Sequence, residues 1–433
     1  MFLRNILLAL LITAATLNAQ LIEAWSGEVS TGNDKRILTL EISQFENTFK
    51  INWSLSEANI YRLPVGEFFY NQNDSLSAPL LIFNHPMGKI EGKFINNKFS
   101  GDLIWNKNSS KIYLEKISDY TLPFYEKEYK INNKEIVLAG TLITPKGTGP
   151  FPAVVFLHGS GPGERWWPMF YAKEFAKIGI ASFVFDKRGS GESTGNWITS
   201  SLNDLTSDAS AVINFLKTMK GINPDKIGIY AVSQSGWVTS RLAVSETPPA
   251  FAIVNSGGGS TPYEVEMVYY KKNLNHSPLT DAEKEEAMNL VKDYLEYLKT
   301  GNNREILVEK INVAKTKNWY KAINIGRVLP SDENRKNWEW VSTYNPITDI
   351  EKINFPIMIL MGEKDDLIHV EIAADKWQQG LSQAQNKSYE IKIFENAGHA
   401  LQLGGHGNFG SFPRYAEGSL EYQIEWLKNN ILK

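Results

Sequence analysis

Ser233 is the side chain in this sequence best placed to act as a nucleophile. It follows an apolar run at residues 227–232 and comes directly before a predicted helix. A serine on such a strand-to-helix turn projects out of a sheet, and the signature of this nucleophile elbow is G-x-S-x-G. The sequence here is Ala231-Val-Ser-Gln-Ser235, so alanine and serine replace the two glycines. Both are small enough for the turn, and Ser235, the rival nucleophile, falls inside the helix.

His399 is the best candidate for the general base that such a serine needs. It follows a predicted strand at residues 389–394 and therefore lies on a loop at the carboxyl edge of a sheet, where catalytic groups gather in open α/β folds. The other five histidines have less suitable settings: His85 in a predicted β domain, His276 in a predicted insertion, His158 directly after a strand, and His369 and His406 in loops without a motif.

A carboxylate that orients the base is expected after the predicted strand at residues 357–360. Glu363, Asp365 and Asp366 all follow this strand. The turn glycine three residues earlier favours Asp365 over Asp366. The resulting chain order is nucleophile, acid, histidine.

Backbone amides must stabilise the oxyanion that forms during acyl transfer. One predicted donor is the amide of Gln234, which follows the nucleophile. The other is expected in the loop His158-Gly-Ser-Gly-Pro-Gly163, from Gly159 or Ser160. A glycine-rich turn can also cradle phosphate, but this spacing matches neither nucleotide-binding signature.

Three tryptophans near these motifs are candidates for the walls of a substrate pocket: Trp166, Trp167 and Trp237. Such pockets are rich in aromatic side chains, although core packing explains each tryptophan equally well. Arg188 is expected to tie its own loop by hydrogen bonds rather than to contact substrate.

The pattern of strands and helices predicts an α/β fold with a mostly parallel sheet covered by helices on both faces. This catalytic domain is predicted at residues 119–256 and 346–433, with a last helix that runs roughly from Tyr415 to Leu427. Residues 257–345 interrupt it with amphipathic helix that begins at the capping box Thr280-Asp-Ala-Glu283. The insertion is predicted to be a helical lid over the carboxyl edge of the sheet, with a structural buttress as the equal alternative.

Residues 20–118 are predicted to form a small antiparallel β domain. Leu38, Leu40 and Ile42 alternate with polar residues, as in a half-buried strand. The pair Asn96-Asn97 between two such runs suits a tight hairpin turn. We expect a sandwich or an open barrel, since the segment is too short for a propeller.

Residues 130–433 resemble the α/β-hydrolases, in particular the exported bacterial esterases related to prolyl-oligopeptidase-like and serine-aminopeptidase-like hydrolases. The resemblance rests on five motifs: His158-Gly-Ser-Gly-Pro162, Asp186-Lys-Arg-Gly-Ser-Gly-Glu-Ser-Thr-Gly195, Ser233-Gln-Ser-Gly-Trp237, Gly362-Glu-Lys-Asp365 and Gly398-His399. It implies the α/β-hydrolase fold and a Ser233–Asp365–His399 triad, in the chain order of that family. Some members carry a small β domain ahead of the hydrolase, which residues 21–118 resemble more loosely.

The first residues predict export. A positive start, an apolar stretch and a small-residue site predict a signal peptide at residues 1–19, cleaved after Ala19, and a periplasmic or extracellular protein. No other segment has the apolar length of a membrane anchor. The chain has no cysteine, which excludes disulfides, a thiol nucleophile and thiolate metal sites. A net charge of -3 gives no case for a nucleic-acid partner.

These features together predict an exported serine hydrolase that cleaves a small-molecule carboxylic ester without a metal or cofactor. A peptidase on the same triad is the alternative enzyme, although no anchor for a peptide terminus is identifiable. A third hypothesis is a non-catalytic glycan-binding protein with a vestigial hydrolase domain, which would need exposed aromatics such as Trp25, Phe68 or Tyr70. The sequence gives no indication of oligomeric state.

Overall fold

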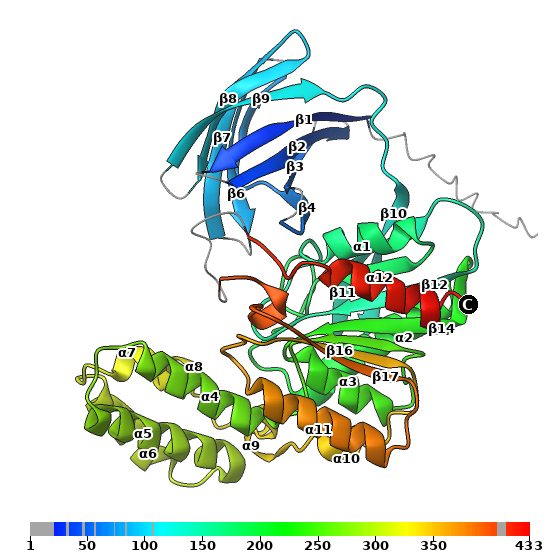
Figure 1. The fold of residues 1–433 in the computed structure, drawn as a ribbon. Coiled ribbons are helices and arrows are strands. Elements are labelled where there is room, and N and C mark those ends of the chain that lie inside the picture. Colours follow the sequence, from blue (N-terminus) through cyan, green and yellow to red (C-terminus); the bar gives the residue numbers. More distant parts are fainter. Residues whose placement is uncertain are drawn as a thin grey trace, which may run out of the picture.

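The computed structural model describes residues 21–31, 34–45, 48–55, 58–72, 74–82, 85–105, 108–404 and 413–433. The predicted signal peptide at residues 1–19 and His406 lie outside these residues. The described chain contains two β-sheets, and the first lies beside the layered α/β part that contains the second (Figure 1). None of the helices in this part of the chain is long and apolar enough to cross a membrane.

The N-terminal domain is a single antiparallel sheet in the strand order β4-β3-β2-β1-β9-β8-β7-β6-β5. Its strands are β1 Leu21–Thr31, β2 Asp34–Phe45, β3 Thr48–Leu55, β4 Ile60–Pro64, β5 Phe69–Asn71, β6 Ser75–Ile82, β7 His85–Ile95, β8 Lys98–Trp105 and β9 Asn108–Lys116. The predicted hairpin is confirmed, since β7 and β8 pair up to Ile95 and Lys98. Asn96 and Asn97 form the turn with φ of 50° and 62°, as a type I′ turn requires.

The sheet curls until its two ends meet. A bridge between Val65, just after β4, and Leu80 joins the β4 end of the sheet to β6, the strand next to the other end. Alternate side chains point inward, and Trp53 and Trp105 meet edge to face in the core with ring centroids 6.1 Å apart. Of the two predicted shapes, the domain is therefore a curled single sheet resembling a barrel rather than a sandwich.

The aromatic side chains that the glycan-binding hypothesis needs at the surface are only partly exposed. Trp25 is 3% exposed and packs against Phe94, so it offers no face to a sugar. Tyr70 is half-buried, and its ring also contacts Phe94. Phe68 is the exposed member of the predicted three, at 38%.

The catalytic sheet has eight strands in the order β10-β11-β13-β12-β14-β15-β16-β17. They are β10 Phe124–Asn133, β11 Ile136–Pro145, β12 Phe151–Leu157, β13 Ala181–Phe185, β14 Ile222–Val232, β15 Ala252–Asn255, β16 Ile357–Gly362 and β17 Tyr389–Phe394. β10 and β11 pair antiparallel, and β11 pairs antiparallel with β13. From β13 to β17 every pair is parallel, so the predicted mostly parallel sheet is confirmed.

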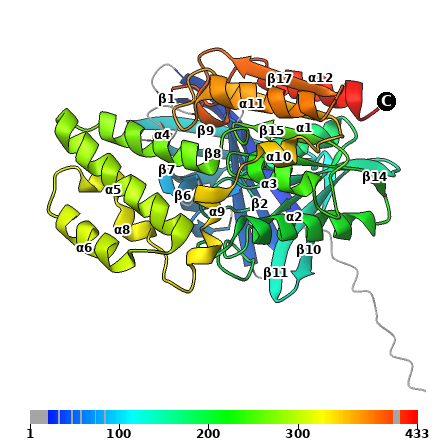
Figure 2. The ribbon, with the colours of Figure 1, turned by 90° about the horizontal axis from the view of Figure 1, so that it is seen from below.

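Helices cover both faces of this sheet (Figures 1 and 2). They are α1 Met169–Lys177, α2 Leu202–Lys217, α3 Ser235–Ala243, α10 Ile347–Ile350, α11 Val370–Gln383 and α12 Ser419–Asn430. Val154 and Phe156 of β12 face a core shared with α1 and α12, whereas Val155 and Leu157 face a core shared with α2, α3 and α11. Burial on both faces explains why β12 is continuously apolar.

The last helix begins later than the sequence suggested. The prediction placed its start near Tyr415, but α12 begins at Ser419. Gly418 precedes it in the left-handed conformation, with φ of 72°, and Tyr415 instead forms a bridge with Gln402. The start was misplaced because this bridge joins residues whose pairing no local pattern reveals.

The helical insertion leaves the sheet after β15 and returns before α10. Its helices are α4 Pro262–Asn275, α5 Asp281–Thr300, α6 Arg304–Ala314, α7 Tyr320–Ile323, α8 Ile325–Val328, the short 3₁₀ helix Arg335–Asn337 and α9 Trp340–Thr343. The predicted capping box at Thr280 and Glu283 is present, and Gly301 ends α5 with φ of 74°. These helices pack around a core of their own.

The insertion is attached at the carboxyl edge of the sheet. Lys272 of α4 forms an ion pair with Asp366 after β16, and Asn337 Nδ2 donates to Thr199 O at 2.8 Å in the loop after β13. This placement is the one predicted for a lid. Closure over the site stays a prediction.

The β domain rests on α1 through β4. Asn59 Nδ2 donates to Tyr171 Oη at 3.2 Å. The buried Arg62 contacts Glu41 at 2.8 Å and Glu126 of β10 at 2.5 Å, and so joins the two sheets by charge. The pairing leaves the buried guanidinium compensated by two carboxylates.

Candidate active site

Ser233 lies at a sharp turn between β14 and α3. β14 ends at Val232, Ser233 has φ of 53°, and α3 begins at Ser235. A positive φ is unusual for a serine and marks local strain of the kind found at functional sites. The turn is held by Ser233 N, which donates to Asn255 O at 2.9 Å, and by Ser233 O, which accepts from Gly236 N at 2.9 Å. The side chain is half-buried.

The two residues that replace the elbow glycines fit for different reasons. Ala231 is fully buried within β14. The Ser235 hydroxyl accepts from Val232 N at 2.6 Å and donates to Val232 O at 2.8 Å, so it closes the turn and is itself occupied. A nucleophilic role for Ser235 would require breaking both bonds.

The close approaches at this elbow fall on two other glycines. A Cβ on Gly236 would lie 2.3 Å from Gly258 N, and one on Gly257 would lie 2.1 Å from Ser233 O. These contacts exclude any side chain at either position. In the usual motif the second glycine leaves room for this close approach. Here Gly236, one residue later, leaves that room.

Asp365 and His399 face each other. Asp365 Oδ2 lies 2.8 Å from His399 Nδ1, and both side chains are almost fully buried. Asp365 Oδ1 accepts from Leu367 N at 2.9 Å, which fixes the carboxylate. Because an ionised carboxylate can only accept, Nδ1 carries the proton and Nε2 holds the lone pair that a general base needs.

The rival carboxylates are engaged elsewhere. Asp366 Oδ2 forms an ion pair with Lys272. Glu363 is exposed and accepts from Asn396 N at 3.0 Å. Asp365 is therefore the one of the three that meets His399.

The loop that carries His399 packs against the elbow. Ala400 N donates to Ser256 Oγ at 3.0 Å, and the next residue back, Asn255, accepts from Ser233 N. A Cβ on Gly362 would lie 2.3 Å from Gly398 O, so the end of β16 approaches this loop closely. The sequence motifs of Ser233, Asp365 and His399 thus meet at one edge of the sheet. Ser256, which the sequence did not single out, links the loop of His399 to the elbow of Ser233.

The other described histidines do not take part. His276 ends α4, with Nδ1 2.8 Å from Lys272 O, and His369 is exposed before α11. His85 lies on β7 in the N-terminal domain. His158 is buried at the end of β12 and packs edge-on against Phe185, and its Nε2 has no hydrogen-bond partner among the described residues. Burial lowers the pKa of His158 to about 3, so this imidazole is neutral.

The main-chain amides of the predicted oxyanion donors make no hydrogen bond to another described residue. Gly159 lies directly over the nucleophile, since a Cβ there would be 3.4 Å from Ser233 Cβ. Within the described chain, the backbone N–H groups of Gly159, Ser160 and Gln234 donate to no other residue. Free amides around a serine are what an oxyanion site requires.

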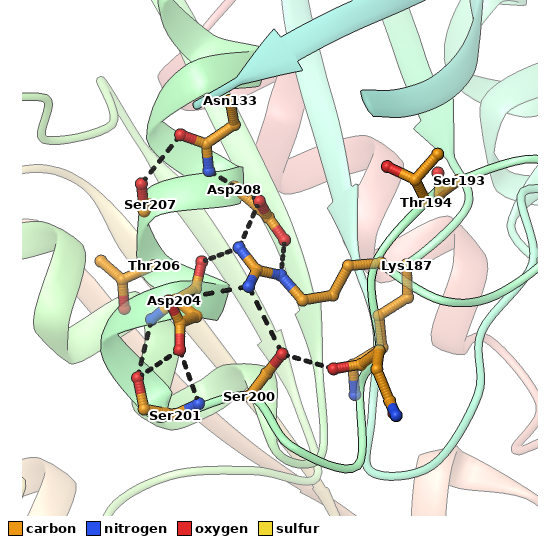
Figure 3. A network of polar contacts seen from close by, with 12 residues as sticks. Asn133, Lys187, Ser193, Thr194, Ser200, Ser201, Asp204, Thr206, Ser207 and Asp208 are labelled. Carbon is orange, nitrogen blue, oxygen red and sulfur yellow. Dashed lines mark hydrogen bonds and ion pairs between the residues drawn. The ribbon is translucent and has the colours of Figure 1, made fainter. Parts of the chain in front are cut away.

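Asp186 and Arg188 anchor the loops around these donors. Asp186 accepts from Arg165 through N at 2.8 Å and Nη2 at 2.7 Å, and both side chains are buried. Arg188 donates to Asp208 of α2 at 2.6 Å and 2.8 Å and to Asp204 O at 3.1 Å. Figure 3 shows the contacts around Asp204 and Asp208, where Asn133 donates to Asp208 and Ser201 donates to Asp204. Arg188 ties its loop by hydrogen bonds, as expected.

Lys187 is the residue whose place the sequence did not reveal. Its ammonium donates to Gly159 O at 2.8 Å, Gly161 O at 3.0 Å and Gln234 Oε1 at 2.9 Å. The sequence signal that could have pointed to this position was a lysine between two charged residues, Asp186 and Arg188, directly after a buried strand.

The three candidate pocket tryptophans lie in different surroundings. Trp166 and Trp167 are half-buried beside the α1 face of the sheet. Trp237 is 8% exposed, donates from Nε1 to Ser260 O at 2.8 Å and contacts the ring of Trp340 in the insertion. Trp237 therefore helps to join the insertion to the catalytic domain, and a pocket role for the three stays a prediction.

Nothing in the site has the composition of a metal centre. No cluster of three or more histidine, aspartate or glutamate side chains suited to a metal ion occurs among the described residues.

Comparison with known proteins identifies the family. The profile of the X-Pro dipeptidyl-peptidase (S15) family matches residues 134–400, well over half of the chain. The chain belongs to this family. The predicted α/β-hydrolase fold and the resemblance to the α/β-hydrolase superfamily are confirmed.

Individual relatives of this S15 member are distant. Esterase EstD of Thermotoga maritima is 24% identical over 305 residues, which cover 67% of this chain and 65% of EstD. An uncharacterized protein of Acanthamoeba polyphaga mimivirus is 26% identical over 172 residues, covering 38% of this chain and 57% of that protein. The matches thus span less than two thirds of the length of these two relatives.

Two of the solved structures that are similar to this chain have low sequence identity to it. An esterase of Pyrococcus furiosus is 18% identical to this chain, with a TM-score of 0.45. The matched region covers 73% of this chain and 96% of the esterase chain. A dienelactone hydrolase from Anabaena variabilis is 13% identical with a TM-score of 0.40, covering 71% of this chain and 99% of its own.

Proposed function

We propose that this protein hydrolyses carboxylic esters through an acyl-enzyme on Ser233, with His399 as general base and Asp365 as the carboxylate that orients it. The observation that carries the proposal is the 2.8 Å contact between Asp365 and His399, on a loop packed against a serine with positive φ. A serine alone is a weak nucleophile, and this constellation is the arrangement that activates it.

The reaction follows from the placement of the groups. Ser233 Oγ attacks the ester carbonyl carbon while His399 Nε2 takes its proton, and Asp365 stabilises the imidazolium. The carbonyl oxygen becomes an oxyanion, for which the amides of Gln234 and of Gly159 or Ser160 are the proposed donors. His399 returns the proton to the leaving alcohol, and water then releases the acyl group by the same steps. No metal or cofactor enters this proposal.

An ester of a small molecule is the proposed substrate class, and two observations support it over a peptide. The relative EstD is named an esterase. Two carboxylates at the carboxyl edge and in the insertion already have cationic partners, because Asp366 after β16 pairs with Lys272 and Glu264 of α4 pairs with Lys376. An enzyme that holds the ammonium of a peptide N-terminus would need an uncommitted carboxylate there.

A peptidase is the second candidate, and the family match favours it. The matching profile is that of X-Pro dipeptidyl-peptidases, and it covers the elbow and both triad loops. The same three side chains would perform amide hydrolysis, with a greater demand on His399 to protonate the leaving amine.

We also propose that the protein acts outside the cytoplasm. The support is the signal-peptide pattern of residues 1–19. Detection of a mature chain beginning at Gln20 in the exported fraction would agree with this proposal, and retention of residues 1–19 in the cytoplasmic fraction would oppose it.

The test compares the mature chain with its Ser233→Ala variant on two substrate classes, para-nitrophenyl esters of short acyl chains and X-Pro para-nitroanilides. Ester turnover that Ser233→Ala abolishes is the expected result. Ester turnover that survives in Ser233→Ala would overturn the assignment of the nucleophile. Anilide turnover that exceeds ester turnover, and is lost in the same variant, would select the peptidase.

A further inference from the structure

Lys187 occupies an unusual position for a buried cation. It follows β13, and the residue is 4% exposed. An ammonium has three donors and no acceptor. All three donors are used on neutral oxygens, which are two main-chain carbonyls of the loop after β12 and the side-chain amide of Gln234. The indole ring of Trp197 lies beneath it, 5.9 Å from Nζ.

The three acceptors belong to the two segments that carry the proposed oxyanion donors. Gly159 and Gly161 lie in the loop after β12, and Gln234 follows the nucleophile. Lys187 N also donates to Gly163 O at 2.8 Å, so main chain and side chain hold the same loop from both ends. One residue therefore fixes the distance between the loop and the elbow.

The bond to Gly159 O also sets the direction of an amide. In a trans peptide unit the C=O and N–H groups point to opposite sides. A Gly159 carbonyl directed at Lys187 therefore turns the N–H of Ser160 away from Lys187. That N–H and the N–H of Gln234 have no other acceptor in the described chain.

We propose that Lys187 is the positioning residue of the oxyanion site, which clamps the loop at Gly159–Gly161 to Gln234 and so aims the amides of Ser160 and Gln234 at the developing negative charge. The inference rests on the proposed function of Ser233 and adds to it. Lys187 touches no substrate, and it acts through the two segments that it joins.

The surroundings of Lys187 make this clamp sensitive to pH. Burial lowers the pKa of the Lys187 ammonium to about 7, while Asp208 of α2 acts in the opposite direction. The other charged groups nearby are committed, since Arg188 pairs with Asp208 and Asp186 pairs with Arg165. His158 also faces the ammonium and is neutral at the pH values concerned.

The sign of the pH effect follows from the donor count. Below about pH 7 the ammonium provides three donors and a positive charge. Above it, the neutral amine has two donors and a lone pair that faces an oxygen. The clamp is therefore complete on the acid side, and kcat should fall as the pH rises through about 7.

Three variants test the clamp. Lys187→Met removes every donor, and Lys187→Arg keeps a charge that is not lost at high pH. Lys226→Met is the matched control, because Lys226 Nζ also donates to main-chain oxygens, of Ile431 at 2.7 Å and Lys433 at 3.1 Å, outside the site. Each variant is assayed for kcat and KM on a para-nitrophenyl ester from about pH 5 to about pH 9. Its melting temperature is also measured.

The expected result for Lys187→Met is a fall in kcat of about 10²-fold, the loss typical of one misplaced oxyanion donor, with KM changed by less than about threefold. The wild type should lose kcat as the pH rises above about 7, and Lys187→Arg should not show that decline. Lys226→Met should match the wild type in kcat and in its pH profile.

Two results would overturn the inference. One is a Lys187→Met variant with the kcat and pH profile of the wild type. The other, which decides the matter even if Lys187→Met does not fold, is a Lys187→Arg variant that keeps the decline above about pH 7. Failure of the proposed function can be distinguished from failure of this inference. In that case the wild type would show no ester turnover, and an alkyl fluorophosphonate would not label its Ser233.

Discussion

Replacing Asp365 by asparagine removes the negative charge that faces His399 and leaves the shape of the side chain almost unchanged. The amide oxygen of the new side chain could still accept from Leu367 N, as Asp365 Oδ1 does at 2.9 Å, so the loop should keep its conformation. The neighbouring Asp366→Asn variant is the control, because Asp366 is a partly exposed acid paired with Lys272. The two variants differ in one respect that matters, which is contact with His399.

The size of the effect follows from the burial of the pair. The side chain of Asp365 is fully buried and that of His399 is 6% exposed. Two unit charges about 4 Å apart at an effective dielectric of about 20 attract by about 4 kcal/mol. In Asp365→Asn, the imidazolium that forms in the transition state loses this attraction. Because each 1.36 kcal/mol changes the rate by a factor of ten, kcat should fall by about 10³-fold.

The assay is initial-rate hydrolysis of a para-nitrophenyl ester by the wild type, Asp365→Asn and Asp366→Asn, with melting temperatures measured alongside. Asp366→Asn should stay within about threefold of the wild type in kcat, because an exposed ion pair contributes about 0–1 kcal/mol. A folded Asp365→Asn enzyme that retains more than about a tenth of the wild-type kcat would refute the reasoning. So would a larger loss in Asp366→Asn than in Asp365→Asn.

Two further predictions concern stability. Ser235→Ala should lower the free energy of unfolding by about 1–3 kcal/mol, because it leaves Val232 N without its buried acceptor. Ser235→Gly should lower it by a further ~1 kcal/mol, because glycine loses more backbone freedom on folding. Urea unfolding measures both variants, and a stabilised Ser235→Gly variant would contradict the account. His158 has a folded-state pKa of about 3, below the ordinary 6.5, so the unfolded chain binds the proton first and stability is lost as the pH falls from about 6.5 towards 3. When the pH falls from 7 to 4, the free energy of unfolding of the wild type should drop by on the order of 3 kcal/mol more than that of His158→Asn. Equal drops in the two proteins would rule out this role for His158.

The parts of the fold that local patterns encode could be predicted from the sequence. The hairpin at Asn96-Asn97, the capping box at Thr280 and the two-faced strand β12 each follow from a few neighbouring residues. Closure of the first sheet at Val65 and Leu80 and the late start of α12 could not be predicted, because both depend on bridges between residues that no local pattern pairs.

The site divides in the same way. The residues on which the proposed triad depends stand in short motifs, and the structure places Asp365 rather than Asp366 against His399. The contacts that hold these motifs together were not visible in the sequence. Lys187 reaches acceptors 26 to 47 residues away, and Ser256 accepts from a residue 144 positions later. Such contacts arise from the approach of separate strand ends, which a single sequence does not specify.

The central claim is that Ser233 is the nucleophile of an acyl-transfer site, and covalent labelling tests it most directly. An alkyl fluorophosphonate is incubated with the wild type, Ser233→Ala and Ser235→Ala, and the labelled peptide is located by mass spectrometry. The account predicts one adduct, on Ser233, in the wild type and in Ser235→Ala, and none in Ser233→Ala. An adduct on Ser235, or labelling that persists in Ser233→Ala, would contradict it.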